Sequence, residues 1–457
     1  MVRRLALVAL VALAALAALV GCGSGAGAPV DGAVGGDAGV IDAPGSDAMA
    51  GDAAVLSFGL TDELSHPPPA DGPHPYSPPG DWLPGQAGFP ALGDSYVDPV
   101  FGAPVTRITD VHPNASASQI YVRNGFWNAD GSLFMHHLPG CDSELVDTAT
   151  GAAVRTGVPG CWRASFDPVD PDVLYYPQGS ELRSYRVSAG TSSLVKDFGA
   201  TLGSLGGSVD YIDRTGRYFV LDVGGSVRVW DKLTDTIYAG ALGAQMVGTG
   251  WIAMSPNAAY LVVPGDFAFT SYAIDHDSKT LDTGGVLFWT LCGDHADVIS
   301  PSDGKTYLVG FECWDEAAIY RIDVSLPQSG DTAAARQKQR DDNLMLLDLD
   351  WSDSGHISCV SGAGPYRDVC YHSVTSGDDS FADPGMWRPY KQEIVMMQVT
   401  PPYPVRRLAH HRSRSTGDSY QYQPRASTSW DGRRVGWVSN YGDSGSDYAD
   451  VYVIHLP

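Results

Sequence analysis

The chain has 457 residues, with 53 acidic against 29 basic side chains and a formal net charge of −24. A surface of this sign repels nucleic acid and anionic lipid head groups, so the composition argues against a nucleic-acid partner. The length accommodates two or three ordinary domains or one large repeat domain.

The N-terminus has the pattern of an export signal. Arg3 and Arg4 precede an uninterrupted Ala/Leu/Val stretch, residues 5–20, which is short for a membrane span. The tetrapeptide Leu-Val-Gly-Cys that ends at Cys22 resembles the bacterial lipobox. The resemblance implies a signal peptide over 1–21, a lipid on the Cys22 thiol, and a lipoprotein of the bacterial cell envelope, with Gly23 favouring the outer membrane. An ordinary secretory signal is the alternative.

Residues 22–93 are rich in Gly, Ala, Asp and Pro and contain few large apolar side chains. Such a composition buries too little surface to offset chain entropy, so we predict a disordered tether. Its Pro-rich part, from His66 to Pro90, is predicted to be extended and to lie against the following domain.

From residue 94 to residue 457 one sequence pattern recurs: an apolar run, a tight turn containing Asp and Gly, and a run of β-forming residues. The spacing of about 40–50 residues is typical of four-stranded propeller blades. We therefore predict an all-β, seven-bladed β-propeller; tandem β-sandwiches, the alternative, would lack this period. The turns are centred on Asp130, Asp172, Gly216, Asn257, Asp303, Gly355 and Asp431.

Further strands complete this prediction. Residues 182–187, 227–231, 318–323 and 451–455 are predicted as fourth strands, and residues 103–108 as a strand that joins the last blade and closes the ring. Residues 331–343 are the helix-like exception, and residues 362–403 are predicted as an insertion in blade six that packs on one face. The Trp230-Asp231 pair matches WD-type blades without the usual partner residues.

Six cysteines remain after Cys22, in a chain with an export signal. In each predicted hairpin two of them are equidistant from the turn, and such residues face each other across antiparallel strands. The predicted disulfides are Cys141–Cys161, Cys292–Cys313 and Cys359–Cys370. A zinc site is the alternative, because Cys-x2-His and His-x2-Cys pairs supply four ligands: Cys292, His295, His356 and Cys359. The two interpretations exclude each other.

The densest group of candidate site residues lies between Arg406 and Asn440. It resembles the seven-bladed polysaccharide lyases of the oligogalacturonate lyase type, in which His and Gln ligands before the last blade hold a divalent metal. The resemblance implies His410 or His411 as the first ligand and Gln423 as another. Arg425 stands where that family has a further His; arginine cannot coordinate a cation but clamps a carboxylate. The remaining candidate ligand-binding residues are Arg412, Tyr420 and Gln421. A solvated rim is the alternative.

Two weaker patterns also suggest chemistry. The pair His136-His137 resembles the paired His of ulvan lyase-type propellers, where a neutral base and a cation act on a uronate, with Tyr175, Tyr176 and Arg183 as helpers; a buried core His is the alternative. The carboxylates of residues 348–355 resemble a calcium loop, with an ordinary turn as the alternative.

The sequence favours an envelope-anchored, monomeric binding module for a carbohydrate or another envelope component. One alternative is a polysaccharide lyase that cleaves uronate-containing glycan by β-elimination, and another is a protein–protein scaffold. A divalent metal (Mn, Ca or Zn) is the candidate cofactor, and the partners are a membrane, through the lipid on Cys22, and a glycan or envelope protein. Propeller folds host all of these functions.

Overall fold

The computed structural model describes residues 56–67, 90–111, 120–138, 140–205, 210–243, 251–265, 268–292, 295–328, 330, 332–376, 387–413, 422–441 and 449–457. All of them belong to one compact unit, Asp52–Pro457; the other unit is Met1–Gly51. None of the helices in the described ranges is long and apolar enough to cross a membrane.

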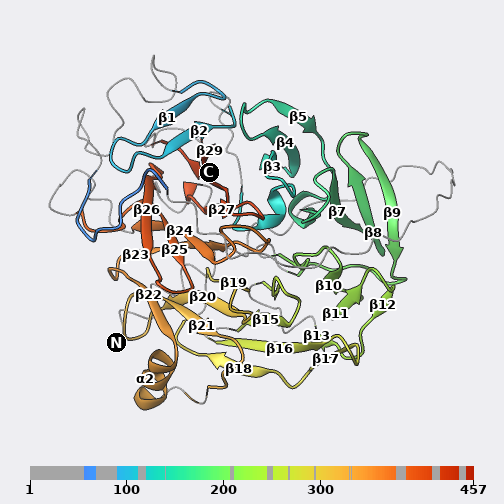
Figure 1. Cartoon of the computed structure of the whole chain (residues 1–457). Helices are drawn as coiled ribbons and strands as arrows, with labels where there is room; N and C mark the ends of the chain where they lie inside the picture. The colour runs from blue at the N-terminus through green and yellow to red at the C-terminus, as the bar shows by residue number, and fades with distance from the viewer. Residues whose placement is uncertain are drawn as a thin grey trace. The chain divides into compact units, whose positions relative to one another are not determined.

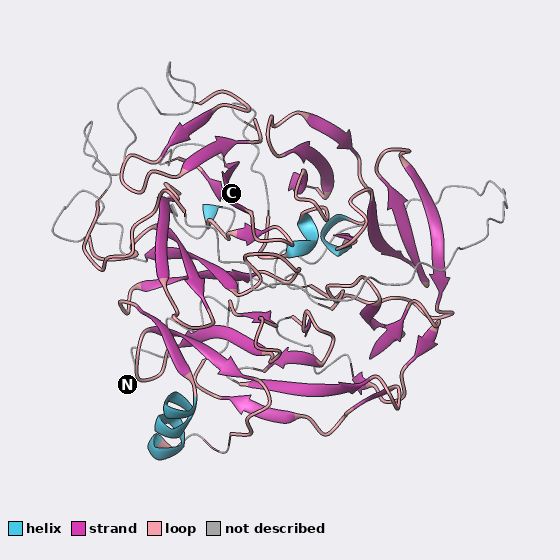
Figure 2. Cartoon of the chain, in the orientation of Figure 1, coloured by secondary structure: helices cyan, strands magenta, loops and turns pink. Residues whose placement is uncertain are grey.

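The fold is an all-β, seven-bladed propeller, as predicted. Seven antiparallel sheets follow one another in the ribbon (Figure 1), and nearly all the regular structure is strand (Figure 2). The innermost strands of neighbouring sheets contact one another, which places them around a common axis.

Blade two has four paired strands, whereas blades one and three lack a regular innermost strand. In blades one and three the innermost position is held by single bridges, Trp127 with Phe134 and Ile212 with Phe219. The elements of blade one are η1 (Asn124–Phe126), β3 (Leu133–Leu138), β4 (Asp142–Asp147) and β5 (Ala153–Thr156). Those of blade two are η2 (Cys161–Arg163), β6 (Ser165–Phe166), β7 (Val173–Gln178), β8 (Glu181–Arg186) and β9 (Thr191–Asp197). Those of blade three are β10 (Tyr218–Asp222), β11 (Ser226–Asp231), β12 (Thr236–Ile237) and β13 (Leu242–Gly243).

The next three blades have a complete strand at every position. Blade four contains β14 (Ala253–Met254), β15 (Tyr260–Pro264), β16 (Phe269–Asp275), β17 (Thr280–Leu281) and β18 (Val286–Trp289). Blade five contains β19 (Asp297–Ile299), β20 (Tyr307–Glu312), β21 (Ala318–Asp323) and β22 (Leu344–Asp348), with the predicted helix, α2 (Ala333–Asp342), before β22. Blade six contains β23 (Asp353–Cys359), β24 (Val369–Ser376), β25 (Glu393–Gln398) and β26 (Val405–His410).

The last blade joins the two ends of the propeller. It contains β27 (Ser427–Thr428), β28 (Arg434–Ser439), β29 (Asp450–His455), β2 (Pro104–Arg107) and β1 (Ser95–Val97). The register pairs Val105 with Ile454 and Arg107 with Tyr452, which confirms the predicted closure by an N-terminal strand. The side chain of Asp450 reinforces it, because its carboxylate accepts hydrogen bonds from Arg107 and Thr109 at 2.8 and 2.7 Å.

The recurring turn contains Asp, Asn or Ser because the side-chain oxygen of this residue accepts hydrogen bonds from backbone N–H groups later in the turn. Asp213 Oδ1 accepts the backbone N–H of Arg217 and Tyr218 at 2.9 and 2.7 Å, and Gly216 adopts a positive φ of 67°. Asn128 does the same for Leu133 at 2.8 Å. A short side chain that accepts these N–H groups fixes the turn between the first two strands of a blade.

Four details differ from the sequence predictions. Residues 182–187, 227–231, 318–323 and 451–455 form third strands, because each blade's fourth strand follows them or, in blade seven, is β2. Gly355 lies inside β23 rather than in a turn; its φ is 133°, and a Cβ there would lie 1.9 Å from the Ser373 carbonyl oxygen. Residues 362–403 are not an insertion, since they supply β24 and β25.

The fourth difference concerns part of the predicted tether. Leu60 forms an antiparallel bridge with Arg407 on the outer edge of β26, and Gly59 N–H donates to the Phe101 carbonyl at 2.7 Å. Arg407 Nη1 donates to the carbonyl of Leu64 at 2.5 Å. We call residues 56–67 the strap, because they cover the edge of blade six.

The buried core is divided among the interfaces between blades. Trp127, Phe134 and Trp430 belong to a cluster shared by blades one, two and seven, whereas Val395 and Ile357 lie in a cluster between blades five and six. Because apolar strands face apolar strands around the axis, burial holds the blades in order. The three predicted disulfides, Cys141–Cys161, Cys292–Cys313 and Cys359–Cys370, are all formed.

Candidate functional site

The residues at which the chain enters the innermost strands share one end of the propeller. Arg163 comes two residues before β6, His295 two residues before β19 and Arg425 two residues before β27. Because the innermost strands contact one another in the same strand order, equal offsets bring these residues to the same end. Arginine and histidine therefore gather there, in a protein that is acidic overall.

The first feature of this end is the His/Arg cluster, which we define as Tyr121, His295, His356, His372 and Arg425. The ring centroids of His295 and His356 are 4.1 Å apart, and Tyr121 meets His356 edge to face at 5.4 Å. Its members come from blades one, five, six and seven. Residues that are far apart in the sequence thus converge on one place.

Burial sets the protonation of two members of this cluster. It lowers the pKa of His356 well below its ordinary value, and electrostatic interactions with His295, Arg425 and His372 lower it further. Burial also lowers the pKa of His372 to about 3. Both imidazoles are therefore neutral at pH 7.

The rim of the cluster is partly exposed. Tyr121, His295 and the neighbouring Gln423 are half-buried, whereas Arg425 is 2% exposed and its Nε donates to the Gln423 carbonyl at 3.2 Å. His295 and Arg425 both have a positive φ, 59° and 39°. Non-glycine residues in this conformation cost energy and concentrate at functional sites.

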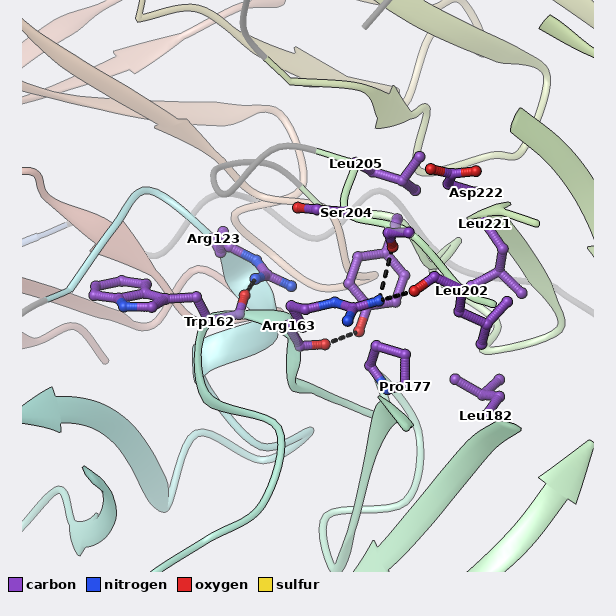
Figure 3. A pocket seen from close by; sticks show the side chains of 12 residues that line it. Arg123, Trp162, Arg163, Pro177, Leu182, Leu202, Ser204, Leu205, Leu221 and Asp222 are labelled. Carbon is purple, nitrogen blue, oxygen red and sulfur yellow. Dashed lines mark hydrogen bonds between the residues drawn. The ribbon is translucent and has the colours of Figure 1, made fainter. Parts of the chain in front are cut away.

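The second feature is a pocket between blades one, two and three, which we call the Arg123 pocket (Figure 3). It is a depression open to solvent, and most of the roughly 480 Å³ of empty space over its lining is open solvent. Its polar lining consists of Arg123, Arg163, Ser204, Tyr211 and Asp222, with Trp162 at one side and aliphatic side chains opposite.

Hydrogen bonds to backbone carbonyls hold the polar lining in place. Arg123 Nη1 donates to the Trp162 carbonyl at 2.5 Å, and the Tyr211 hydroxyl donates to the Arg163 carbonyl at 2.8 Å. Arg163 Nη2 donates to Leu202 and Gly203 at 2.6 and 2.7 Å. Burial lowers the pKa of Arg163, which nevertheless stays protonated at neutral pH.

Two buried carboxylates lie beside the innermost strands. Asp210 accepts the backbone N–H of Asn124 and Gly125 at 2.8 and 2.9 Å, and Asp297 accepts that of Cys359 at 2.6 Å. Burial raises the pKa of both groups, that of Asp297 strongly. Gly125 permits this approach, because a Cβ there would lie 2.9 Å from Asp210 Oδ1 and 2.0 Å from Ser165 Oγ.

The structure does not bring His410 and His411 together with Gln423 as a ligand set. His410 Nε2 donates to the His66 carbonyl at 2.9 Å. His411 Nε2 donates to the Val374 carbonyl at 2.9 Å, while its Nδ1 accepts the N–H of Ser413 at 3.0 Å. Both rings are fully buried, and both nitrogens of His411 are occupied.

The pair His136-His137 lies inside blade one. Both side chains are buried; His136 Nε2 is 3.0 Å from Glu144, and His137 Nδ1 is 2.8 Å from Ser143 Oγ. Of the expected helpers, Tyr175 donates to Asp167 at 2.8 Å. The other two make separate contacts: Tyr176 donates to Ser192 and Arg183 pairs with Glu181.

The zinc alternative is wrong, because Cys292 and Cys359 are in disulfides and offer no thiolate. His295 and His356 do come together. Arg425, at this end, offers only N–H donors and cannot coordinate a cation. Among the described residues no group of three or more His, Cys, Asp or Glu is placed to hold a metal.

In the predicted calcium loop, the central carboxylates accept hydrogen bonds from protein side chains. Arg388 Nη2 donates to Asp353 at 2.5 Å, and Asp350 accepts from Ser352 at 2.8 Å. Arg412 is buried with its guanidinium 5.6 Å from the Tyr441 ring. The remaining predicted positions, Cys22, Tyr420 and Gln421, lie outside the described residues.

Sequence reasoning missed Arg123 and Arg163, although the sequence contains a signal for the second. Arg-Ala-Ser occurs at Arg163 and again at Arg425, each time directly before an innermost strand. Arg123 directly precedes η1 in blade one, without this tripeptide. An alignment of the blades on this tripeptide would have identified the end of the propeller that carries the site.

The chain is similar in fold to several solved structures. No protein-family profile matches the sequence, and no curated protein does. An oligogalacturonate lyase from Vibrio parahaemolyticus is similar over 80% of this chain and 96% of its own, at 11% identity and a TM-score of 0.48. An oligogalacturonate lyase in complex with manganese covers the same shares at 16% identity and 0.48. Hydrazine synthase from Kuenenia stuttgartiensis is similar over 72% and 94%, at 14% and 0.41.

Proposed function

We propose that the protein is a lipid-anchored, extracytoplasmic binding module that binds an acidic carbohydrate, or a comparable anionic envelope component, at the His/Arg cluster. The observation that carries the proposal is the convergence of Arg425, His295, His356 and Tyr121 from four blades on one end of the axis. A guanidinium matches a carboxylate with two parallel hydrogen bonds, and aromatic rims suit sugar rings.

The proposed location rests on two features of the chain. The segment that ends at Cys22 resembles a lipobox, and the three disulfides suit an oxidising compartment. We place the protein in the bacterial cell envelope, held by a lipid on Cys22.

A lyase is the second candidate, because the cluster pairs neutral imidazoles with a cation, as β-elimination at a uronate requires. Binding is favoured over catalysis because a base must touch the substrate proton, and the rings of His356 and His372 are buried. An anion held at the half-buried rim, Tyr121 and His295, needs only the nearby charge of Arg425, which is itself 2% exposed. A candidate base must reach the proton that it removes.

The test is calorimetric titration of the full-length chain with oligogalacturonate, an alginate oligosaccharide and a neutral maltooligosaccharide. We expect binding of an acidic glycan, no binding of the neutral one, and affinity at least tenfold weaker in Arg425→Gln. Arg433→Gln, on the turn of the same blade and 46% exposed, is the matched control and should bind normally.

Two outcomes would overturn the proposal: no acidic glycan binds, or Arg425→Gln binds as the wild type does. Absorbance at 235 nm is followed in the same mixtures. A rising signal that disappears in Arg425→Gln would replace binding by the lyase activity.

A further inference from the structure

The Arg123 pocket contains a buried cation whose hydrogen-bonding capacity is only partly used. Arg123 is 2% exposed, and its Nη1 donates to the Trp162 carbonyl. Its Nε and Nη2 are buried and make no hydrogen bond with any residue that the structure describes. A guanidinium stays charged and carries five donors, so these unused N–H groups are costly.

The neighbouring groups satisfy this guanidinium only in part: it forms a long ion pair with Asp210 and interacts with the Tyr211 hydroxyl. The closest oxygen of Asp210 is 4.0 Å from Arg123 Nε, and that carboxylate already accepts two backbone N–H groups. Asp222, which also lines the pocket, accepts the N–H of Gly225 at 2.8 Å. The guanidinium instead lies over the rings of Phe126 and Tyr211, 5.2 and 5.3 Å from their centroids.

The unused donors have a definite shape. Nε and Nη2 lie on one edge of the guanidinium plane, which is the edge that receives both oxygens of a carboxylate in a fork-to-fork pair. A second cation, Arg163, also lines the pocket (Figure 3).

One side of the pocket is aliphatic. Figure 3 shows aliphatic side chains across from the arginines, and five of them line it: Pro177, Leu182, Leu202, Leu205 and Leu221. A ligand that fills this space gains by burying an apolar group while its charged end faces Arg123.

We propose that the Arg123 pocket binds a small monocarboxylate with an apolar body, its carboxylate oxygens accepting from Arg123 Nε and Nη2. A charged head and an apolar tail match the two sides of the pocket. This proposal uses residues outside the His/Arg cluster and does not depend on glycan binding.

The test is ligand-observed NMR and calorimetry of the full-length chain with sodium hexanoate, 1-hexanol and hexylamine. These probes share one tail and differ only in the head group. We expect hexanoate to bind at least tenfold more tightly than either of the others. Equal binding of hexanol, or no binding of hexanoate, would overturn the proposal.

Two variants locate the site. Arg123→Gln keeps a polar side chain but shortens it and removes the charge. Ser204→Trp fills the rim while leaving Arg123 intact. Each should weaken hexanoate binding at least tenfold. Arg186→Gln, whose side chain is 53% exposed in blade two, is the control and should bind as the wild type does. If both pocket variants retain full affinity with an unchanged melting curve, the proposal is wrong. Glycan affinity, which Arg425→Gln tests, is measured separately.

Discussion

At the scale of single residues, the molecule keeps several histidines neutral by burying them. His411 is the clearest case, because burial lowers its pKa to about 3 and both ring nitrogens are hydrogen-bonded to backbone. His137 is similar, with a pKa lowered by burial to about 3. These side chains pack in the interior of the protein. Because their pKa values are lower in the folded state than in the unfolded chain, they make the folding stability depend on pH.

We predict that His411→Gln reduces the pH dependence of folding stability. The unfolded chain protonates His411 below about pH 6.5, whereas the folded chain does not until about pH 3, so the unfolded state binds one more proton between pH 4 and 6. Stability contributed by this residue is complete above pH 6.5 and falls as the pH falls. The variant should lack about 1.4 kcal/mol of slope per pH unit.

Urea titrations at pH 4, 5, 6 and 7 check this prediction, since the slope separates the proton effect from any constant loss of packing. His276→Gln is the control: His276 is half-buried, its ring nitrogens contact Tyr238 and Ala258, and its ring packs on Tyr218 at 4.2 Å, so the variant loses comparable contacts. An unchanged slope in His411→Gln would show that the ring titrates in the folded state.

Residue identity also explains which parts of the site the sequence could predict. The pairs of cysteines were predictable because a disulfide needs only local hairpin register. The sequence predicted that His295 and His356 lie close together, but as zinc ligands with Cys292 and Cys359, which form disulfides instead. The environment of Arg123 was not predictable, because it depends on Trp162 and Tyr211 from two other blades.

At the scale of elements, the strap is the feature that could not be predicted from the sequence. Its composition predicts disorder, yet it forms backbone hydrogen bonds with β26. Because β26 is the edge strand of blade six, its free edge would otherwise be open to pairing with other chains. The prediction failed because propensity describes a segment alone, whereas Arg407 and His410 supply partners from elsewhere. The turns, by contrast, carry their own hydrogen-bond acceptors and were predictable, with Gly355 as the exception.

We predict that Leu60→Pro releases the strap. Leu60 N–H donates to the Arg407 carbonyl at 3.1 Å, and proline removes this donor, at a cost of about 1–3 kcal/mol. Leu60→Ala, which keeps the N–H, is the matched control. Hydrogen exchange followed by mass spectrometry should show faster exchange in β26 for the proline variant alone; equal exchange in both variants would mean that the backbone pairing does not hold the strap.

At the scale of the whole molecule, the propeller depends on the closure between β2 and β29. Arg107 is buried at this junction and pairs with two carboxylates, Asp450 at 2.7 Å and Asp110 at 2.5 Å. Asp450 is fully buried, whereas the side chain of Asp110 is 49% exposed. The two pairs therefore differ in environment while sharing one cation.

We predict that Asp450→Ala destabilises the whole propeller by about 3–5 kcal/mol, because it leaves Arg107 and the hydroxyl of Thr109 without their buried acceptor. Asp110→Ala, which removes the exposed partner of the same arginine, should cost less than about 1 kcal/mol. Chemical denaturation of both variants measures the difference. Similar losses in the two variants would show that Asp450 does not hold the closure.

The closure has a mechanical consequence. The disulfides join residues only 20, 21 and 11 positions apart, so each one staples a local stretch, whereas hydrogen bonds and packing join β2 to β29. If the N-terminus is tethered to a membrane, a pull on the domain is applied first to the strap and then to β1 and β2. The load would peel strands from the edge of the ring one hydrogen bond at a time, and the propeller would open at its seam while the stapled hairpins stayed intact.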